Sequence, residues 1–227
     1  TDQIVISVAN TNDAPTVANE LVDQTTISGR ESIYTIATNS FADVDASDTL
    51  TYSVTLEGGA SVPSWLVINS TTGALTANPT ASDAGSISVT VTATDSASSP
   101  LTAADTFTIA VTANQTPSVM GLANQTATED TAVSFSLADT SFADADSDSL
   151  TVTVLGEPTW LSYDADTKTF TGTPTTDSHA GTSTITVTAT DASGAAGAAT
   201  FDLVTSASND APVFSSAASL NVAANSS

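Results

Sequence analysis

The sequence predicts an all-β protein made of tandem β-sandwiches, each with roughly seven short strands. Apolar residues alternate with polar ones, as expected for strands with one buried face: Ile87, Val89 and Val91 are separated by hydroxyl residues. Gly and Pro clusters such as Asn78-Pro79 end these runs. No apolar stripe of helical period and useful length is found. In the first repeat, strands are expected near residues 17–28, 32–38, 49–56, 64–69, 73–77, 86–94 and 104–112.

A repeat of about 100 residues organises the chain. Asn12-Asp13-Ala14-Pro15 recurs as Asn114-Gln115-Thr116-Pro117 and as Asn209-Asp210-Ala211-Pro212. Other landmarks follow in the same order, including Pro63-Ser64-Trp65-Leu66, which matches Pro158-Thr159-Trp160-Leu161. The predicted domains are a sandwich at 10–113 and a second at 114–208, preceded by the last strand of an earlier repeat (1–9) and followed by the first strand of a later one (209–227).

The terminal strands allow two interpretations. We expect the chain to be an internal part of a longer array, because residues 1–9 have an apolar face but lack a complete sheet. The alternative is head-to-tail strand exchange between neighbouring chains.

Charge excludes several functions. The 227 residues include 25 Asp and Glu but only 2 Lys and Arg, giving a net charge of -23 and a pI near 4.1. We therefore expect no nucleic-acid binding, because cationic groups that could neutralise phosphates are nearly absent. An anionic membrane would repel the chain, and no run approaches the roughly 20 apolar residues of a membrane span. The absence of Cys fits a large exported surface protein.

Acidic side chains recur in the predicted loops and linkers. Successive strands run in opposite directions, so the loop with Asp43 and Asp45, the loop that begins at Asp95 and the entering linker should share one pole of the sandwich. Carboxylates this close repel, by about 4 kcal/mol for two charges about 4 Å apart at an effective dielectric near 20. A cation relieves this repulsion, and an all-oxygen set without His or Cys suits Ca²⁺ better than Mg²⁺.

Three groups of candidate calcium ligands follow from these positions. At the linker 112–117 they are Glu31, Asp83, Asn114, Asp144, Asp146 and Asp191. At the entrance to the first repeat they are Asn12, Asp13, Asp43, Asp45 and Asp95. At the exit of the second repeat they are Glu129, Asp177, Asn209 and Asp210. Asp48 and Asp148 are interpreted as turn residues, because the two loops differ in length by one residue. The alternative for all these acids is a solvated surface.

These motifs resemble those of dystroglycan-type cadherin-like domains, found in large bacterial surface proteins and RTX-type adhesins. Asn12-Asp13-Ala14-Pro15 is similar to the cadherin linker, Asp43-Val44-Asp45 to the cadherin Asp-x-Asp, and Ala93-Thr94-Asp95 to the cadherin Ala-x-Asp. The resemblance implies immunoglobulin-like (cadherin-like) seven-strand sandwiches, Ca²⁺ between repeats and a role in cell adhesion. This sequence departs from the family because the cadherin Asp-Arg-Glu is missing and Gln115 replaces an Asp.

The functional expectation is a calcium-rigidified extender, or stalk, of an extracellular adhesin or surface fibre on a bacterial cell, in a biofilm for example. It would hold a distal binding module away from the cell. Its expected partners are neighbouring repeats, with polysaccharide or cell-surface ligands bound through other domains. The alternative is a carbohydrate-binding or self-associating module of a secreted polysaccharide-degrading protein. We expect no enzyme activity, because the paired carboxylates recur in every repeat and no Ser-His-Asp arrangement repeats.

Overall fold

The computed structural model describes residue 4, residues 11–45 and residues 47–211. The described chain forms two compact units. The first comprises the residues up to Pro117 together with the loops Asp144–Leu150 and Thr190–Ala196. The second comprises Ser118–Ala143, Thr151–Ala189 and the residues from Gly197 onward.

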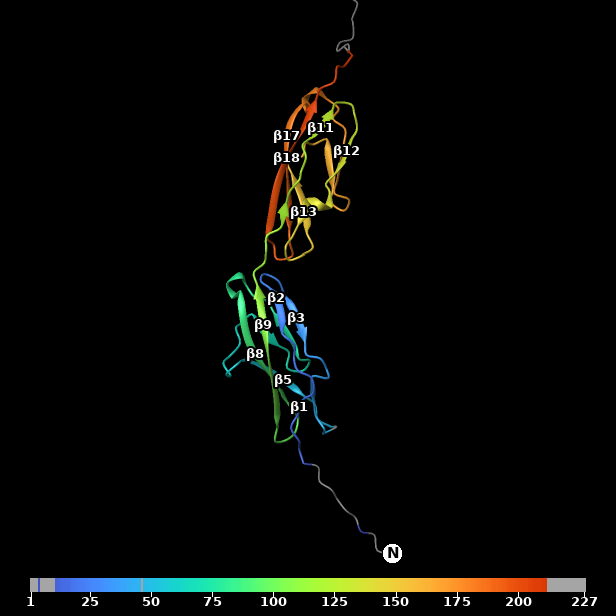
Figure 1. Cartoon of the computed structure of the whole chain (residues 1–227). Coiled ribbons are helices and arrows are strands. Elements are labelled where there is room, and N and C mark those ends of the chain that lie inside the picture. Colours follow the sequence, from blue (N-terminus) through green and yellow to red (C-terminus); the bar gives the residue numbers. More distant parts are fainter. Residues whose placement is uncertain (1–3, 5–10, 46, 212–227) are drawn as a thin grey trace, which may run out of the picture. The chain divides into compact units, whose positions relative to one another are not determined.

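Each unit contains a β-sandwich, as predicted. In the first, the four-stranded sheet has the order β2 (Gln24–Ile27), β9 (Thr102–Thr112), β8 (Gly85–Thr94) and β5 (Thr51–Leu56). The opposing three-stranded sheet has the order β3 (Ser32–Thr35), β7 (Ala74–Ala77) and β6 (Leu66–Ile68). A short ribbon pairs β1 (Thr16–Val17) with β4 (Phe41–Ala42), and a 3-10 turn, η1, covers Ala81–Asp83. Figure 1 labels β1, β2, β3, β5, β8 and β9 of this sandwich.

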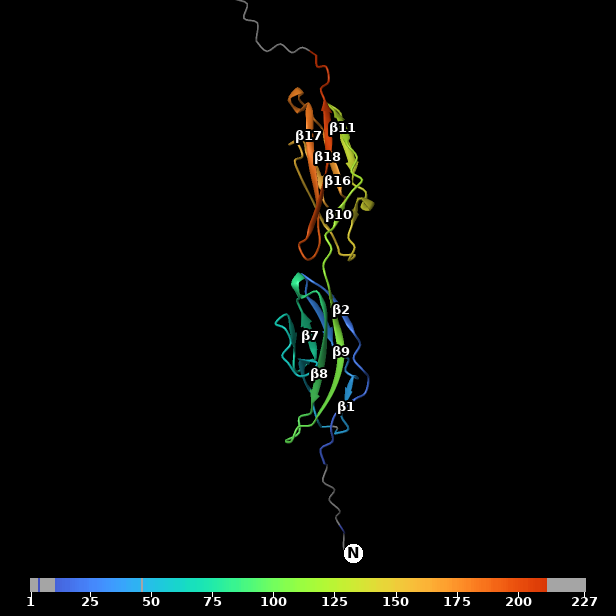
Figure 2. The ribbon, with the colours of Figure 1, turned by 60° about the vertical axis from the view of Figure 1, so that its left-hand side comes forward.

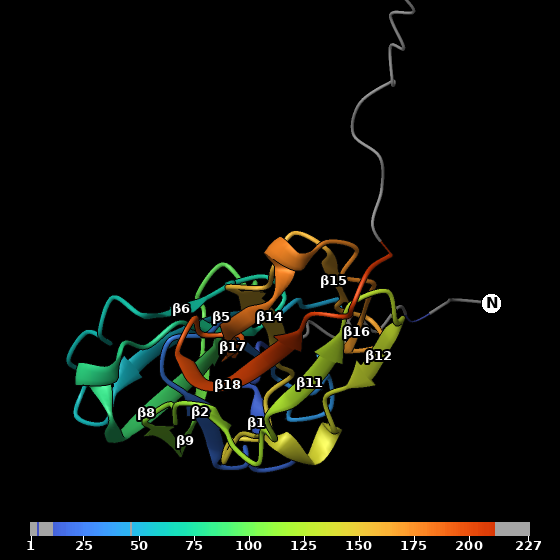
Figure 3. The ribbon, with the colours of Figure 1, turned by 90° about the horizontal axis from the view of Figure 1, so that it is seen from above.

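The second sandwich repeats this topology (Figures 2 and 3). Its four-stranded sheet has the order β11 (Gln125–Thr128), β18 (Ala196–Ser206), β17 (Gly181–Thr190) and β14 (Thr151–Leu155). Its three-stranded sheet has the order β12 (Val133–Ser136), β16 (Thr169–Gly172) and β15 (Leu161–Asp164), and its ribbon pairs β10 (Ser118–Val119) with β13 (Phe142–Ala143). Its 3-10 turns are η2 (Asp139–Ser141) and η3 (Asp177–His179).

The cores follow from the alternation in the sequence. Val89, Val91 and Ala93 of β8 are completely buried, as are Ile185 and Val187 of β17. Hydroxyl residues between them point away from the core, so each central strand has one apolar face. The second core is more aromatic: Phe170 lies 4.8 Å, centroid to centroid, from both Phe135 and Tyr163.

The expected strand 17–28 consists of two pieces in the structure, because the chain crosses from one partner to another. The N–H groups of Ala18 and Asn19 donate to the carbonyl of Ser40, and Leu21 N–H donates to the Asp105 carboxylate at 2.6 Å. The segment then enters β2, which pairs with β9 in parallel. The domain limits at 10–113 and 114–208 stay predictions. The predicted terminal strands, 1–9 and 209–227, fall outside the described residues, except for Ile4 and residues 209–211.

Replacing Phe170 tests the aromatic core. We expect Phe170→Ala to lower the free energy of unfolding by about 3–5 kcal/mol, because it leaves a cavity among three rings. Phe170→Leu should cost much less, since the first sandwich carries Leu75 at the same register position. Urea denaturation followed by Trp fluorescence measures both. Exposed Leu155→Ala is the control, and equal losses in the two Phe170 variants would contradict this account.

Candidate metal-binding loops

The loop between β4 and β5 folds around its own aspartates. Asp45 N–H donates to Asp43 Oδ1 at 2.8 Å, which closes a turn around the side chain. Asp48 N–H donates to the Asp45 carbonyl at 2.9 Å. The loop has few backbone partners of its own, so the carboxylates complete its hydrogen bonding and are thereby held in fixed positions.

The entering linker is attached to these loops through the same acids. Asp13 N–H donates to Asp45 Oδ2 at 2.8 Å, and the Asn12 amide donates to Asp95 Oδ2 at 3.0 Å. Asp95 begins the loop between β8 and β9, and its Oδ1 accepts the N–H of Ala97. The structure therefore brings together all five residues predicted at this entrance.

Asp95 remains ionised despite its burial. Only 4% of the residue is exposed, and this burial acts to raise the pKa of its carboxyl. Hydrogen bonds from Asn12, Leu101 and Ala97 outweigh the desolvation, so the pKa of Asp95 lies below its usual value. The carboxylate thus keeps its charge and its capacity to bind a cation at neutral pH.

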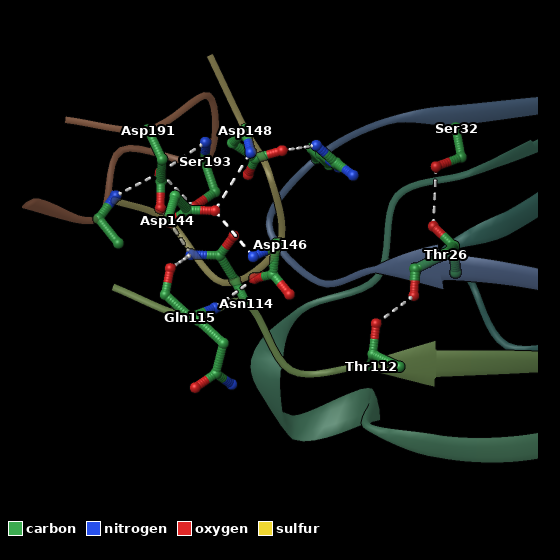
Figure 4. A network of polar contacts seen from close by, with 12 residues as sticks. Thr26, Ser32, Thr112, Asn114, Gln115, Asp144, Asp146, Asp148, Asp191 and Ser193 are labelled. Carbon is green, nitrogen blue, oxygen red and sulfur yellow. Dashed lines mark hydrogen bonds and ion pairs between the residues drawn. The ribbon is translucent and has the colours of Figure 1, made fainter. Parts of the chain in front are cut away.

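The linker 113–117 repeats this network (Figure 4). Asp146 N–H donates to Asp144 Oδ1 at 2.9 Å, Gln115 N–H donates to Asp146 Oδ2 at 2.6 Å, and the Asn114 amide donates to Asp191 Oδ2 at 2.8 Å. Gln115 contacts Asp146 through its backbone N–H, as Asp13 contacts Asp45, so a Gln can stand in place of the Asp without losing this bond. Desolvation raises the pKa of Asp191, but hydrogen bonds from Asn114, Ser193 and Ala195 outweigh it and lower that pKa overall.

Several oxygens in these networks are buried without a hydrogen-bond partner. They are Asp43 Oδ2 at the first entrance, and Asp144 Oδ2, Asp148 Oδ2 and Asn114 Oδ1 at the linker. One oxygen of Asp43 and of Asp144 holds the loop, while the other has no partner. Asp43, Asp48 and Asp95 also have carboxylate oxygens within 4.8 Å of one another. Buried, unpartnered oxygens grouped in this way fit the donor set of a hard cation such as Ca²⁺.

A third acidic group lies at the exit of the second sandwich. Carboxylate oxygens of Glu129, Asp177 and Asp210 lie within 4.8 Å of one another. Glu129 is 3% exposed, and its Oε2 accepts the N–H of Ser208 in the outgoing linker. Asp177 opens η3 and is exposed, as are Asn209 and Asp210. Three of the four residues predicted for this group are thus adjacent.

Glu31 and Asp83 occupy different environments. Glu31 is exposed before β3. Asp83 ends η1, where its carboxylate accepts the N–H and the hydroxyl of Thr80 and a bond from Trp65, and these contacts lower its pKa. Neither belongs to a group of three carboxylates close enough to share an ion within the described ranges.

Two acids outside the predicted ligand sets belong to the sites. Asp48 joins Asp43 and Asp95, and the Asp148 side chain is only 2% exposed. The sequence signal was present, because each acid follows an Asp-x-Asp. The loop with Asp48 is one residue longer than the loop with Asp148, and this difference hid the equivalence of the two acids, although both loops direct this carboxylate inward.

Comparison with known proteins identifies the domain type. A family model described as "Putative Ig domain" matches residues 14–112 and again residues 116–206. No curated protein matches the chain significantly. No helix of the described residues is long and apolar enough to cross a membrane.

Solved structures with similar chains come from several kinds of protein. An endo-fucoidan hydrolase of glycoside hydrolase family 107 is 24% identical over 86% of this chain and 29% of its own, with a TM-score of 0.38. Mouse cadherin-23 EC22-24 is 16% identical over 86% of this chain and 65% of its own, with a TM-score of 0.35. The human desmocollin-1 ectodomain is 14% identical over 87% and 42%, with a TM-score of 0.38. The chain therefore spans less than a third of the hydrolase, and similarities this low carry no argument about function.

The lowered pKa of Asp191 gives a pH-dependent prediction. In chelator at pH 7, Asp191→Asn should reduce the free energy of unfolding by about 1–2 kcal/mol, because the oxygen that accepts the Asn114 amide is lost. Since the folded-state pKa is depressed, the wild-type advantage is present above the unfolded value of about 3.9 and is lost as pH falls through the folded pKa.

Thermal unfolding between pH 7 and pH 2 measures this difference. Asp166→Asn is the matched control, because the Asp166 side chain is exposed and accepts no hydrogen bond within the described residues. An Asp191→Asn deficit that stays constant down to pH 2 would show that its charge does not stabilise the fold.

Proposed function

The chain belongs to the Ig-domain family whose model matches it twice, and on that basis we propose that it is a calcium-stiffened extender of an extracellular protein. Its repeats would act as a spacer that holds a distal binding module away from a cell. An adhesin or surface fibre of a bacterium is the context that best fits the absence of Cys and the strongly acidic charge.

One observation carries the calcium proposal: the sites hold buried carboxylate oxygens that no hydrogen bond satisfies. Asp43 Oδ2, Asp144 Oδ2 and Asp148 Oδ2 are of this kind. A buried, unpartnered carboxylate oxygen is costly, whereas a solvated surface would leave such atoms in water. The two Asp-x-Asp loops, with their linkers, have the same hydrogen-bond network, which favours a common ligand.

The ligand set at each site follows from these positions. At the first entrance Asp43, Asp48 and Asp95 would bind the ion directly, and Asn12 and Asp45 would hold the linker beside it. At the linker 113–117 the corresponding residues are Asn114, Asp144, Asp146, Asp148 and Asp191. All donors are oxygens, which suits Ca²⁺ and excludes a preference for softer metals.

Bound calcium would stiffen the array through its linkers. Each linker is already hydrogen-bonded to the acids of the sandwich that follows it, and the linker 113–117 continues directly from β9. Without an ion the clustered carboxylates repel one another, which weakens these attachments. An ion shared by linker and loops would therefore restrict the swing of neighbouring repeats.

We propose a non-catalytic role for the carboxylates. They recur in corresponding loops of both repeats, and each holds backbone N–H groups or a linker amide. This suits architecture more than a single active site with an acid and a base of separated pKa values.

Carbohydrate binding is a second candidate, supported by a groove on the first sandwich. Trp65, Asn78, Thr80 and Asp83 line this open groove, which offers a ring beside hydrogen-bonding groups. Trp65 is half-buried against the core, and its contact with Asp83 fixes the indole. Trp160 in the second sandwich is also half-buried but lies 6.4 Å from the His179 ring, centroid to centroid.

Removing one ligand tests the calcium proposal. Ca²⁺ should raise the melting temperature of the wild type with a dissociation constant on the order of 10⁻⁴–10⁻³ M, and saturation at about a hundredfold excess adds about 2.7 kcal/mol. Asp144→Asn should lose the part of this increase that the linker 113–117 contributes, while melting near the wild type in EDTA. Glu57→Gln makes the same charge change at an exposed site and should respond to Ca²⁺ as the wild type does.

Small-angle scattering tests the stiffening. The distribution of interatomic distances should sharpen or extend when Ca²⁺ is added. Indifference of both the melting temperature and the scattering to Ca²⁺ and EDTA would refute calcium binding and leave the acids as a solvated surface.

The groove gives a separate prediction. In a Trp160→Phe variant, only Trp65 fluoresces in the indole range, so sugar binding in the groove should shift this signal with added oligosaccharide. The matched Trp65→Phe variant, which retains Trp160, should not respond. If neither variant shows a shift at millimolar neutral or anionic oligosaccharides, the groove is not a sugar site.

A further inference from the structure

One of the chain's two cationic side chains is paired with a buried carboxylate. Arg30, just after β2, forms an ion pair with Asp148 Oδ1, and both residues belong to the first unit. The Asp148 side chain is 2% exposed and that of Arg30 is 34% exposed. The other cation, Lys168, pairs with Asp139, whose side chain is 89% exposed. Only the Arg30 pair therefore neutralises a charge removed from water.

Arg30 lies where the first sandwich lacks the acids of the second. Ser28 and Glu129 are equivalent, because the N–H of each donates to the carbonyl of the last residue of the final strand, Thr112 or Ser206, at 2.9 Å. Each side chain also accepts an N–H from the outgoing linker: Ser28 Oγ from Asn114 at 3.1 Å, and Glu129 Oε2 from Ser208 at 3.0 Å. A neutral hydroxyl thus occupies the place of a carboxylate.

A second acid is missing at the same end. Each sandwich has a 3-10 turn preceded by a threonine N-cap, and its first residue is Ala81 in η1 but Asp177 in η3. Gly29 N–H donates to the Pro79 carbonyl, and Asp130 N–H donates to the equivalent Pro174 carbonyl. The residue after each donor is therefore equivalent, so Arg30 corresponds to Thr131. Gln115 stands in the linker 113–117 where Asp210 stands in the next one, so the first sandwich and its outgoing linker have none of the three carboxylates that form the Glu129–Asp177–Asp210 group.

We propose that the Arg30 guanidinium replaces bound calcium as the counter-charge at the linker 113–117, so that this linker requires fewer ions than the linker that follows the second sandwich. This inference rests on the proposed calcium role, and it identifies the linker at which Ca²⁺ binds less tightly. Arg30 occupies Asp148 Oδ1 and leaves only Oδ2 for a metal. The guanidinium also repels an ion at the adjacent carboxylates, which lowers the affinity of this site for Ca²⁺.

The linker 113–117 and the linker that follows the second sandwich therefore depend on Ca²⁺ to different degrees. The linker 113–117 has a permanent cation on the protein itself, so its network persists when Ca²⁺ is scarce. The Glu129–Asp177–Asp210 group has no such partner within the described residues and depends on a free ion.

The test compares Arg30→Gln with Lys168→Gln, which remove the same charge from a buried and an exposed pair. In EDTA, calorimetry should show that Arg30→Gln lowers the melting temperature of the first unit by about 5 °C or more, because Asp148 stays buried without its partner. Lys168→Gln should shift its own transition by less than about 2 °C. On Ca²⁺ titration, Arg30→Gln should bind about tenfold more tightly at this site and recover most of the lost melting temperature.

A gain-of-site variant gives an independent readout. Ser28→Glu, Ala81→Asp and Gln115→Asp combined with Arg30→Thr install the side chains of Glu129, Asp177, Asp210 and Thr131, and should raise the Ca²⁺ stoichiometry in equilibrium dialysis by at least one ion per chain. A wild type that binds Ca²⁺, together with an Arg30→Gln variant of unchanged stability and affinity, would overturn this inference but leave the extender role intact. A wild type that binds no Ca²⁺ would instead overturn the extender role.

Discussion

Carboxylates that accept backbone N–H groups are the interaction on which the ends of both sandwiches depend. The loops after β4 and β8 lack ladder partners, and Asp43 and Asp95 supply the missing acceptors. Each such acid is fixed by one oxygen, so its second oxygen is fixed too, whether or not anything binds there. The loops could not retain this shape with neutral apolar residues, and the clustered charge is therefore a consequence of how the loops are built.

Much of the fold could be predicted from the sequence, because it depends on a period of two and on a repeat of landmarks. The buried faces of β8 and β17 follow directly from the alternation of Val and Ile with Thr and Ser. The division of the expected strand 17–28 could not be predicted, since it depends on Asp105 accepting the N–H of Leu21, a contact between residues 84 apart. Alternation describes which face is buried but not which sheet a strand joins.

The acids were harder to place for the same reason. Asp43, Asp45 and Asp95 precede or follow predicted strands closely, so their pole could be derived. Glu31 lies close to the position of Glu129 in the repeat, but the hydrogen-bond register pairs Glu129 with Ser28 instead. A shift of a few residues in a turn changes which side chain meets the linker, and only the backbone contacts resolve it.

The parallel pairing of β2 with β9 has a mechanical consequence. Four residues of β2 lie in register with four of β9, and β11 and β18 repeat this arrangement. The chain enters each sandwich shortly before the first strand of the pair and leaves at the end of the second. Tension along the polypeptide would then pull the two strands past each other lengthwise, loading their hydrogen bonds together instead of opening them one by one. Such a shear geometry would resist extension along the chain in both described sandwiches.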